Sequence, residues 1–120
     1  MKTVLAAVAA FLIGASVVKG ATNTSVVLIN PFEVPEGELD ATIAMWEQAR
    51  DFLQLQPGYR STALHQSLAD DARFRLINVA EWESAEAFMA ASKKMQSEAG
   101  LSGVDGLVAS PALFRVIRQD

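Results

Sequence analysis

Apolar residues between positions 24 and 118 follow two patterns, short continuous runs and runs spaced at helical intervals. The continuous runs are rich in β-branched residues and predict four strands, at residues 24–34, 59–68, 73–82 and 112–118. Apolar positions three and four residues apart predict two helices, at residues 38–54 and 85–98. Ser84 is placed to cap the second helix. This order predicts an α+β protein with an antiparallel, ferredoxin-like β-α-β-β-α-β sheet.

Two connections complete the predicted topology. Residues 69–72 form a tight polar turn, which makes a hairpin of the second and third strands. Residues 99–110 hold three glycines and predict a loop with a short helical turn.

Both faces of the predicted sheet are apolar, because polar residues hardly alternate with apolar ones in its strands. In the first strand, Val26 and Leu28 point one way, and Val27 and Ile29 point the other. Two right-handed crossovers place both helices on one face, so the other face lacks a cover. An exposed apolar surface of that size favours association. We therefore expect a homodimer in which two sheets pack face to face, a dimeric α/β barrel.

The first twenty residues form a separate segment. Lys2 precedes an apolar run at residues 4–18, and Val18-Lys19-Gly20 ends the segment before Ala21. This order is typical of a secretory signal peptide. The alternative is an uncleaved anchor, but the run is shorter than the ~20 residues that a spanning helix needs. We expect a signal peptide at residues 1–20, a single domain at residues 21–120, and an exported protein, periplasmic or secreted, without a stable membrane anchor.

The composition is that of a folded domain. The chain has 120 residues, of which 51% are hydrophobic and 20% charged. The net charge is −4, and loss of Lys2 and Lys19 leaves eight basic and 14 acidic residues, a net charge of −6. This charge argues against nucleic acid or an anionic membrane as a partner. The absence of cysteine excludes disulfides and a thiolate nucleophile, and no metal-ligand motif is recognisable.

Polar and aromatic residues at strand ends predict a pocket. Asn30 shares a strand face with Phe32, and Trp82 shares one with Asn78. If both faces meet the helices, these residues line one cavity. Trp82 is then a pocket wall for a planar aromatic molecule, or else a core aromatic at the strand–helix corner. Trp46, on the first helix, is a further candidate for binding the substrate at the pocket mouth, or else a core residue. Tyr59, in the turn after that helix, lines the pocket mouth or belongs to the core.

Three segments carry a resemblance to a known family: LINPFEVPEG at residues 28–37, QPGYRSTALHQS at residues 56–67 and RFRLINVAEWESAEAF at residues 73–88. They resemble the antibiotic biosynthesis monooxygenase (ABM) domain over about residues 25–95. The resemblance implies the dimeric barrel fold. It also implies a function among cofactor-independent oxygenases that turn aromatic polyketides or quinols into quinones. Other members degrade haem.

The resemblance turns three residues into catalytic candidates. Asn30 would orient a substrate phenol or stabilise an enolate-like oxygen, and Trp82 would position the ring. His65, the lone histidine, would remove the substrate's proton, or would lie at the dimer interface without a chemical role. No cofactor and no metal are expected. The alternative function is an exported dimer that binds a small hydrophobic or redox-active ligand without turning it over.

Two features depart from the family's haem-degrading branch and from its usual cellular setting. That branch uses an asparagine on the first strand, a tryptophan ending the third and a histidine on the next helix, but residues 85–98 contain no histidine. Haem binding through His65 is therefore the weaker hypothesis. The predicted export signal also differs from the cytosolic setting of the family.

Three arginines cluster at the predicted hairpin: Arg60, Arg73 and Arg75. They form a solvated edge, or else they steer an acidic ligand.

Overall fold

The computed structural model describes residues 24–120, so the predicted signal peptide and its cleavage site lie outside the described residues. Within these described residues, two helices, α2 (Leu39–Leu53) and α3 (Ala85–Glu98), accompany an antiparallel sheet. Its strands are β1 (Val26–Glu33), β2 (Tyr59–Gln66), β3 (Leu76–Trp82), β4 (Val108–Ala109) and β5 (Ala112–Phe114). The strand order is β2-β3-β1-β4, and β5 also pairs with β1. The predicted ferredoxin-like α+β fold is confirmed.

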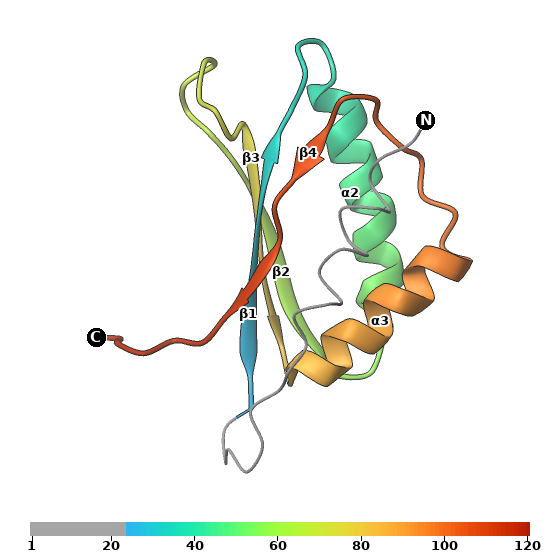
Figure 1. Cartoon of the computed structure of the whole chain (residues 1–120), viewed down its shortest axis with the longest axis vertical. Helices are drawn as coiled ribbons and strands as arrows, with labels where there is room; N and C mark the ends of the chain where they lie inside the picture. Colours follow the sequence, from blue (N-terminus) through green and yellow to red (C-terminus); the bar gives the residue numbers. More distant parts are fainter. Residues whose placement is uncertain (1–23) are drawn as a thin grey trace.

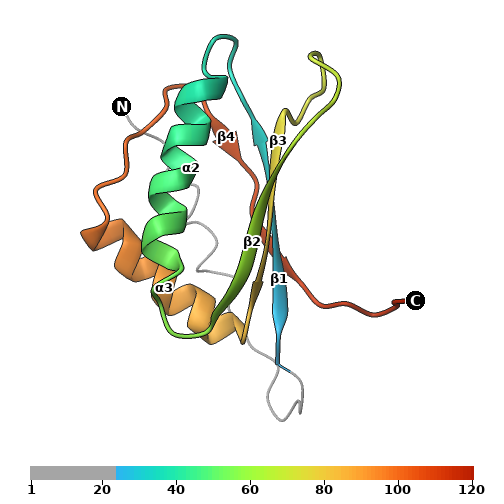
Figure 2. The same cartoon turned by 180° about the vertical axis from the view of Figure 1, so that it is seen from behind.

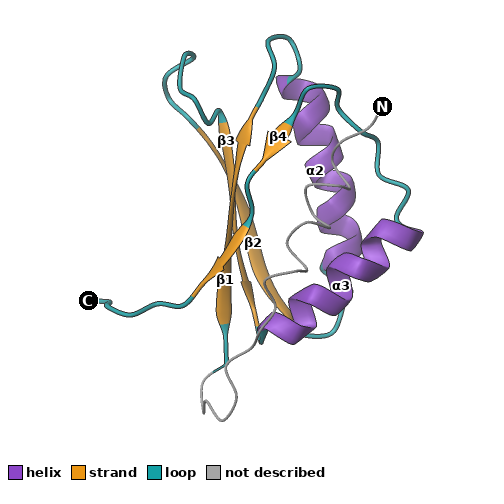
Figure 3. Ribbon diagram, in the orientation of Figure 1, coloured by secondary structure: helices purple, strands orange, loops and turns teal. Residues whose placement is uncertain are grey.

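The molecule has two layers, as Figures 1 and 3 show. Helices α2 and α3 cover the same face of the sheet, which we call the inner face, and no helix of residues 24–120 lies on the opposite, outer face (Figure 2). The register places Leu28, Asn30 and Phe32 of β1 opposite Ala80, Asn78 and Leu76 of β3 on the inner face. All six are buried. Alternation along β1 and β3 therefore separates a buried face from a partly exposed one.

Local contacts fix the position of α3 against the sheet. The Ser84 hydroxyl accepts a hydrogen bond from the Ala87 amide at 3.1 Å, which confirms the predicted N-cap. Gly58 precedes β2 with a φ of +89°, and a Cβ there would collide with the Cβ of Ala87. The turn before β2 therefore packs directly on the first turn of α3, and only glycine allows that approach.

Two apolar clusters form the core between the layers. One gathers around Phe32, Met45 and Leu76, and the other around Trp82 and Phe88. Met45 and Met95 are buried in this interior and Met89 lies at its margin, which agrees with a filling role for the methionines.

The C-terminal strand differs from the prediction. Residues 112–118 were expected to form one strand, but β5 ends at Phe114, and the predicted loop contains the short strand β4. Pro111 lies between the two short strands and cannot donate a backbone hydrogen bond, which separates them. Phe114 pairs with Val27, next to the beginning of β1, so the chain beyond it runs past the end of its partner strand. That segment extends away from the body (Figure 1).

The connection between β2 and β3 is also longer than predicted. The expected turn exists, because the Ala72 amide donates to the Ala69 carbonyl at 3.3 Å. The strand β3, however, begins at Leu76 rather than at residue 73, and residues 67–75 form the connection. Polar contacts hold it, with the Arg75 guanidinium donating to the Ser67 hydroxyl at 3.0 Å.

Candidate functional site

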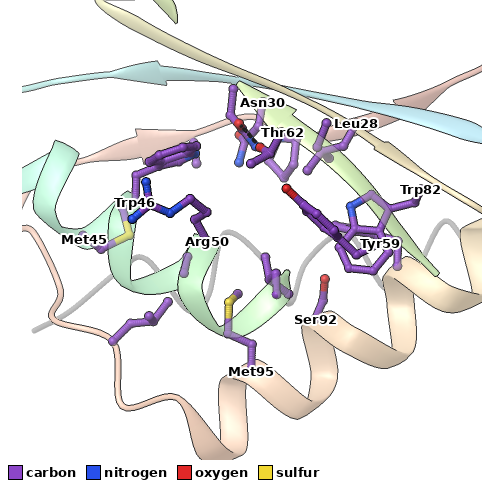
Figure 4. Close-up of a pocket in the computed structure, with 18 of the residues that line it drawn as sticks. Leu28, Asn30, Met45, Trp46, Arg50, Tyr59, Thr62, Trp82, Ser92 and Met95 are labelled. Atoms are coloured by element: carbon purple, nitrogen blue, oxygen red, sulfur yellow. Dashed lines mark hydrogen bonds between the residues drawn. The ribbon is translucent and has the colours of Figure 1, made fainter. Parts of the chain in front are cut away.

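A cavity lies between the inner face of the sheet and the two helices (Figure 4). About 70 Å³ of it is open to the centre of a water molecule, several times the space that one water needs. Its walls are mainly apolar and aromatic, which is typical of sites for small organic molecules. The lining residues come from the sheet, from both helices and from the segment that leads to β5.

The sheet contributes a polar floor. Asn30 on β1 lies directly opposite Asn78 on β3, and both residues are 8% exposed. The Thr62 hydroxyl on β2 donates to the Asn78 side-chain oxygen at 2.7 Å, so that acceptor is satisfied. The Asn30 Oδ1 is buried and has no hydrogen-bond partner. An unpaired buried acceptor is costly, so the floor offers a ready site for a hydrogen-bond donor.

Aromatic rings form one wall. Trp82 is 1% exposed and makes edge-to-face contacts with two rings, Tyr59 at a centroid distance of 5.6 Å and Phe88 at 5.6 Å. Such contacts fix the orientation of the indole. The Tyr59 hydroxyl points into the cavity (Figure 4). The arrangement presents flat apolar surfaces to a planar ligand.

Helix α3 supplies the side opposite the sheet. Phe88, Ser92 and Met95 lie on its buried face at helical spacing, and all three line the cavity. Ser92 is 1% exposed, and its hydroxyl has no hydrogen-bond partner. The cavity therefore has a second unpaired polar atom, on the wall that faces the sheet.

Helix α2 places a cation among the lining residues. The Arg50 guanidinium stacks over the Trp46 ring at 5.3 Å and forms an ion pair with Asp51 at 2.9 Å. Its side chain is 37% exposed, so Arg50 lies where the cavity meets solvent. Trp46 and Arg50 together form a charged aromatic rim.

His65 lies apart from the cavity. It pairs with Ile77 across β2 and β3 on the outer face, and its Nδ1 is 3.3 Å from the Ile77 carbonyl oxygen. The side chain is exposed and does not line the cavity. Haem ligation through His65 would therefore place the haem on the outer face. The catalytic role of His65 stays a prediction, and this subunit's geometry gives it no route to a ligand in the cavity.

The three arginines near the hairpin each have an acidic partner. Arg60 pairs with Glu81 at 3.6 Å, Arg73 with Glu33 at 3.4 Å and Arg75 with Asp70 at 3.8 Å. This pairing favours the interpretation of the three arginines as a solvated edge.

Among residues 24–120 no group of acidic or histidine side chains is arranged to hold a metal ion. None of the helices in that range has the length and apolar character needed to cross a membrane.

The structure brings together five of the six residues predicted for the site: Asn30, Phe32, Trp46, Asn78 and Trp82. Their chemical roles stay predictions. The sequence interpretation missed Thr62, Arg50 and Ser92 as lining residues. A usable signal existed for Ser92, because it is a polar residue within the apolar stripe of α3.

The family model for the antibiotic biosynthesis monooxygenases matches residues 25–100. The chain belongs to this family. The match covers every strand except β4 and β5, and both helices, so the ABM domain includes the sheet floor and α3 wall of the cavity.

Two solved structures are similar to the chain in sequence and in fold. A candidate monooxygenase from Shewanella loihica PV-4 is 48% identical over 82% of this chain and all of its own, with a TM-score of 0.75. The haem-degrading protein MhuD from Mycobacterium tuberculosis, solved with two haems in its active site, is 27% identical over 79% of this chain and 98% of its own, with a TM-score of 0.60.

A third structure supports the fold alone. SnoaB from Streptomyces nogalater, a cofactor-independent oxygenase, is 22% identical over 81% of this chain and 96% of its own, with a TM-score of 0.61. No curated protein sequence matches the chain.

Proposed function

We propose that this protein is a cofactor-independent monooxygenase that oxidises a small planar phenol or quinol in the cavity. Membership of the ABM family supports oxygenase chemistry, and the Shewanella relative is described as a candidate monooxygenase. The observation on which the proposal chiefly depends is the Asn30 Oδ1, a buried unpaired acceptor on the floor of an aromatic-walled cavity. A phenolic hydroxyl is the donor that fits both the polarity of that atom and the flat walls.

The reaction needs only the substrate and dioxygen. The phenol loses its hydroxyl proton, and the resulting anion passes electrons to O₂. A ring carbon that carries hydrogen, ortho or para to the hydroxyl, gains one oxygen atom. The other oxygen atom takes up the hydrogen from that carbon and the released proton, and leaves as water. One phenol and one O₂ thus give one quinone and one water.

The protein's part is to bind, orient and desolvate. The amide of Asn30 can accept a hydrogen bond from the phenol and, after turning, donate one to the phenolate that forms. Trp82 and its neighbouring rings hold the substrate plane, and the buried floor limits the water that would compete for the anion.

We also propose that the active form is an exported homodimer. The outer face carries half-exposed apolar side chains on its two central strands, and Phe114, Val116 and Ile117 are 49%, 57% and 72% exposed. A second copy packed on this face would cover them.

Oxygen consumption tests the proposed reaction. With anthrone or a quinol as substrate, an oxygen electrode should record uptake above the uncatalysed rate, with one water formed per O₂ and no hydrogen peroxide. Asn30→Ala should reduce the catalysed rate about 100-fold, because it removes the group that stabilises the anion. Gln66→Ala removes an exposed amide at the end of β2 and is the matched control. A rate equal to the blank, or an Asn30→Ala rate equal to wild type, would contradict the proposal.

Binding without turnover is the second candidate function. Among the described residues that line the cavity there is no histidine and no carboxylate, the side chains that most often act as general bases. This observation favours a carrier for an aromatic molecule. Saturable binding of the same quinols with no oxygen uptake would support that function over catalysis.

A further inference from the structure

Ser92 has an unusual environment for a serine within a helix. Helical serines commonly satisfy their hydroxyl with a backbone carbonyl one turn earlier. Ser97 on the same helix does so, because its hydroxyl donates to the Lys94 carbonyl at 3.1 Å. Ser92 makes no such bond although it is 1% exposed. Its hydroxyl points from α3 toward the sheet (Figure 4).

Two unpaired polar atoms therefore face one cavity from opposite walls. The Asn30 Oδ1 belongs to the sheet and the Ser92 hydroxyl to α3, and both residues line the same space. A buried polar atom without a partner destabilises the folded protein. Among residues 24–120 there is one further such atom, the Gln96 side-chain nitrogen, and Gln96 does not line the cavity. A ligand that satisfied Asn30 and Ser92 together would remove both penalties.

We propose that Ser92 is a second ligand-binding residue, and that the ligand is an aromatic ring with a hydrogen-bonding group at each end. One end donates to the Asn30 Oδ1, and the other exchanges a hydrogen bond with the Ser92 hydroxyl. This inference rests on the proposed function, because it takes the cavity to be the site of the aromatic substrate. It narrows that substrate from phenols in general to rings with polar groups at both ends.

The rest of the cavity lining suits such a ring. Trp82 and Phe88 contribute aromatic surface, and Leu28 and Ala80 add apolar contacts from the sheet. A ring with a polar group at each end matches a mainly apolar cavity in which the sheet and α3 each contribute one unpaired polar atom. Because a hydroxyl can both donate and accept, Ser92 can bind the hydroxyl of a quinol or the carbonyl oxygen of a quinone.

A comparison of two ligands of nearly equal shape tests the proposal. Hydroquinone and 4-methylphenol differ by a hydroxyl against a methyl at one end. Anaerobic titration calorimetry with the wild-type protein should show tighter binding of hydroquinone. Ser92→Ala should weaken hydroquinone binding about tenfold and leave the affinity for 4-methylphenol unchanged or higher. Ser97→Ala removes a hydroxyl from the exposed side of the same helix and should change neither affinity.

The possible results distinguish a failure of this inference from a failure of the proposed function. Equal loss of both affinities in Ser92→Ala would mean a packing role and would overturn the inference. So would wild-type protein that binds the two ligands equally, although oxygen uptake with phenols would then leave the proposed function standing. If neither ligand binds and no oxygen is taken up, both the inference and the proposed function are rejected. A thermal melt of the unliganded Ser92→Ala protein guards against misfolding, since loss of an unpaired hydroxyl should not lower its melting temperature.

Discussion

The two faces of the sheet are built from the same strands but differ in the burial and hydrogen bonding of their polar side chains. On the inner face the pair Asn30 and Asn78 is buried, and one of its oxygens lacks a partner. On the outer face, Arg60 and Glu81 are each 48% exposed and pair with each other at 3.6 Å. An unpaired polar atom is thus found on the face from which water is excluded, whereas this ion pair lies where water is available. Such a deficit in a buried region is a sign of a binding site rather than of a stabilising core.

Residue parity creates this difference. Ile29, Val79 and Ala63 form one cross-strand row that points outward, and the adjacent row of Asn30, Asn78 and Leu64 points inward. A slip of one residue would exchange the two sets. The inner face is therefore a site because the helices enclose its polar row, and the outer face remains an apolar surface available for association.

The largest effect should come from removing the inner wall. Trp82→Ala should lower the free energy of unfolding by about 3–5 kcal/mol, because the indole is fully buried between two rings. Phe114→Ala on the outer face should cost about 1 kcal/mol in a single subunit, since half of that ring is already exposed. Urea unfolding at low protein concentration measures both. Equal costs for the two variants would contradict the distinction between the faces.

Association of the outer face should be the next most sensitive property. Ile29→Lys places a charge in the middle of the outer row and should weaken homodimer formation about 100-fold, because an unpaired charge would be buried at the interface. Leu68→Lys changes an exposed residue of the β2–β3 connection and is the matched control. Sedimentation equilibrium over a range of concentrations measures the dissociation constant.

The result for the wild-type protein decides the premise of that experiment. A folded monomer at micromolar concentration would refute the homodimer. A dimer that Ile29→Lys leaves intact would place the interface elsewhere on the molecule.

Much of the fold could be predicted from the sequence, because local and periodic signals agree. The N-cap at Ser84 and the apolar stripe of α3 define that helix before any tertiary contact is known. The C-terminal strands could not be predicted in this way. Their extent depends on where β1 ends and on the proline between them, and pairing partners are set by the tertiary structure.

The candidate site was predictable where it depends on strand parity. Asn30, Asn78 and Trp82 were expected on one surface because alternation along strands has a fixed period. Ser92 and Arg50 were not anticipated, since their approach depends on how the helices cross the sheet. His65 also follows strand parity. Its position in β2 places it on the outer face, although its chemistry alone suggested a catalytic base.

The smallest expected effect is a difference in stability between two variants of the inner face, one at a polar group that has a hydrogen-bond partner and one at a polar group that has none. Thr62→Val should lower the free energy of unfolding by about 1–2 kcal/mol, because it leaves the Asn78 side-chain oxygen without its donor. Ser92→Ala, at a residue that is more deeply buried, should leave the stability unchanged or raise it by up to about 1 kcal/mol, because no bond is lost. Chemical unfolding of both variants without ligand gives the comparison. Destabilisation by Ser92→Ala as large as that by Thr62→Val would show that the Ser92 hydroxyl is satisfied within the protein, and the wall opposite the sheet would then have no vacancy for a ligand.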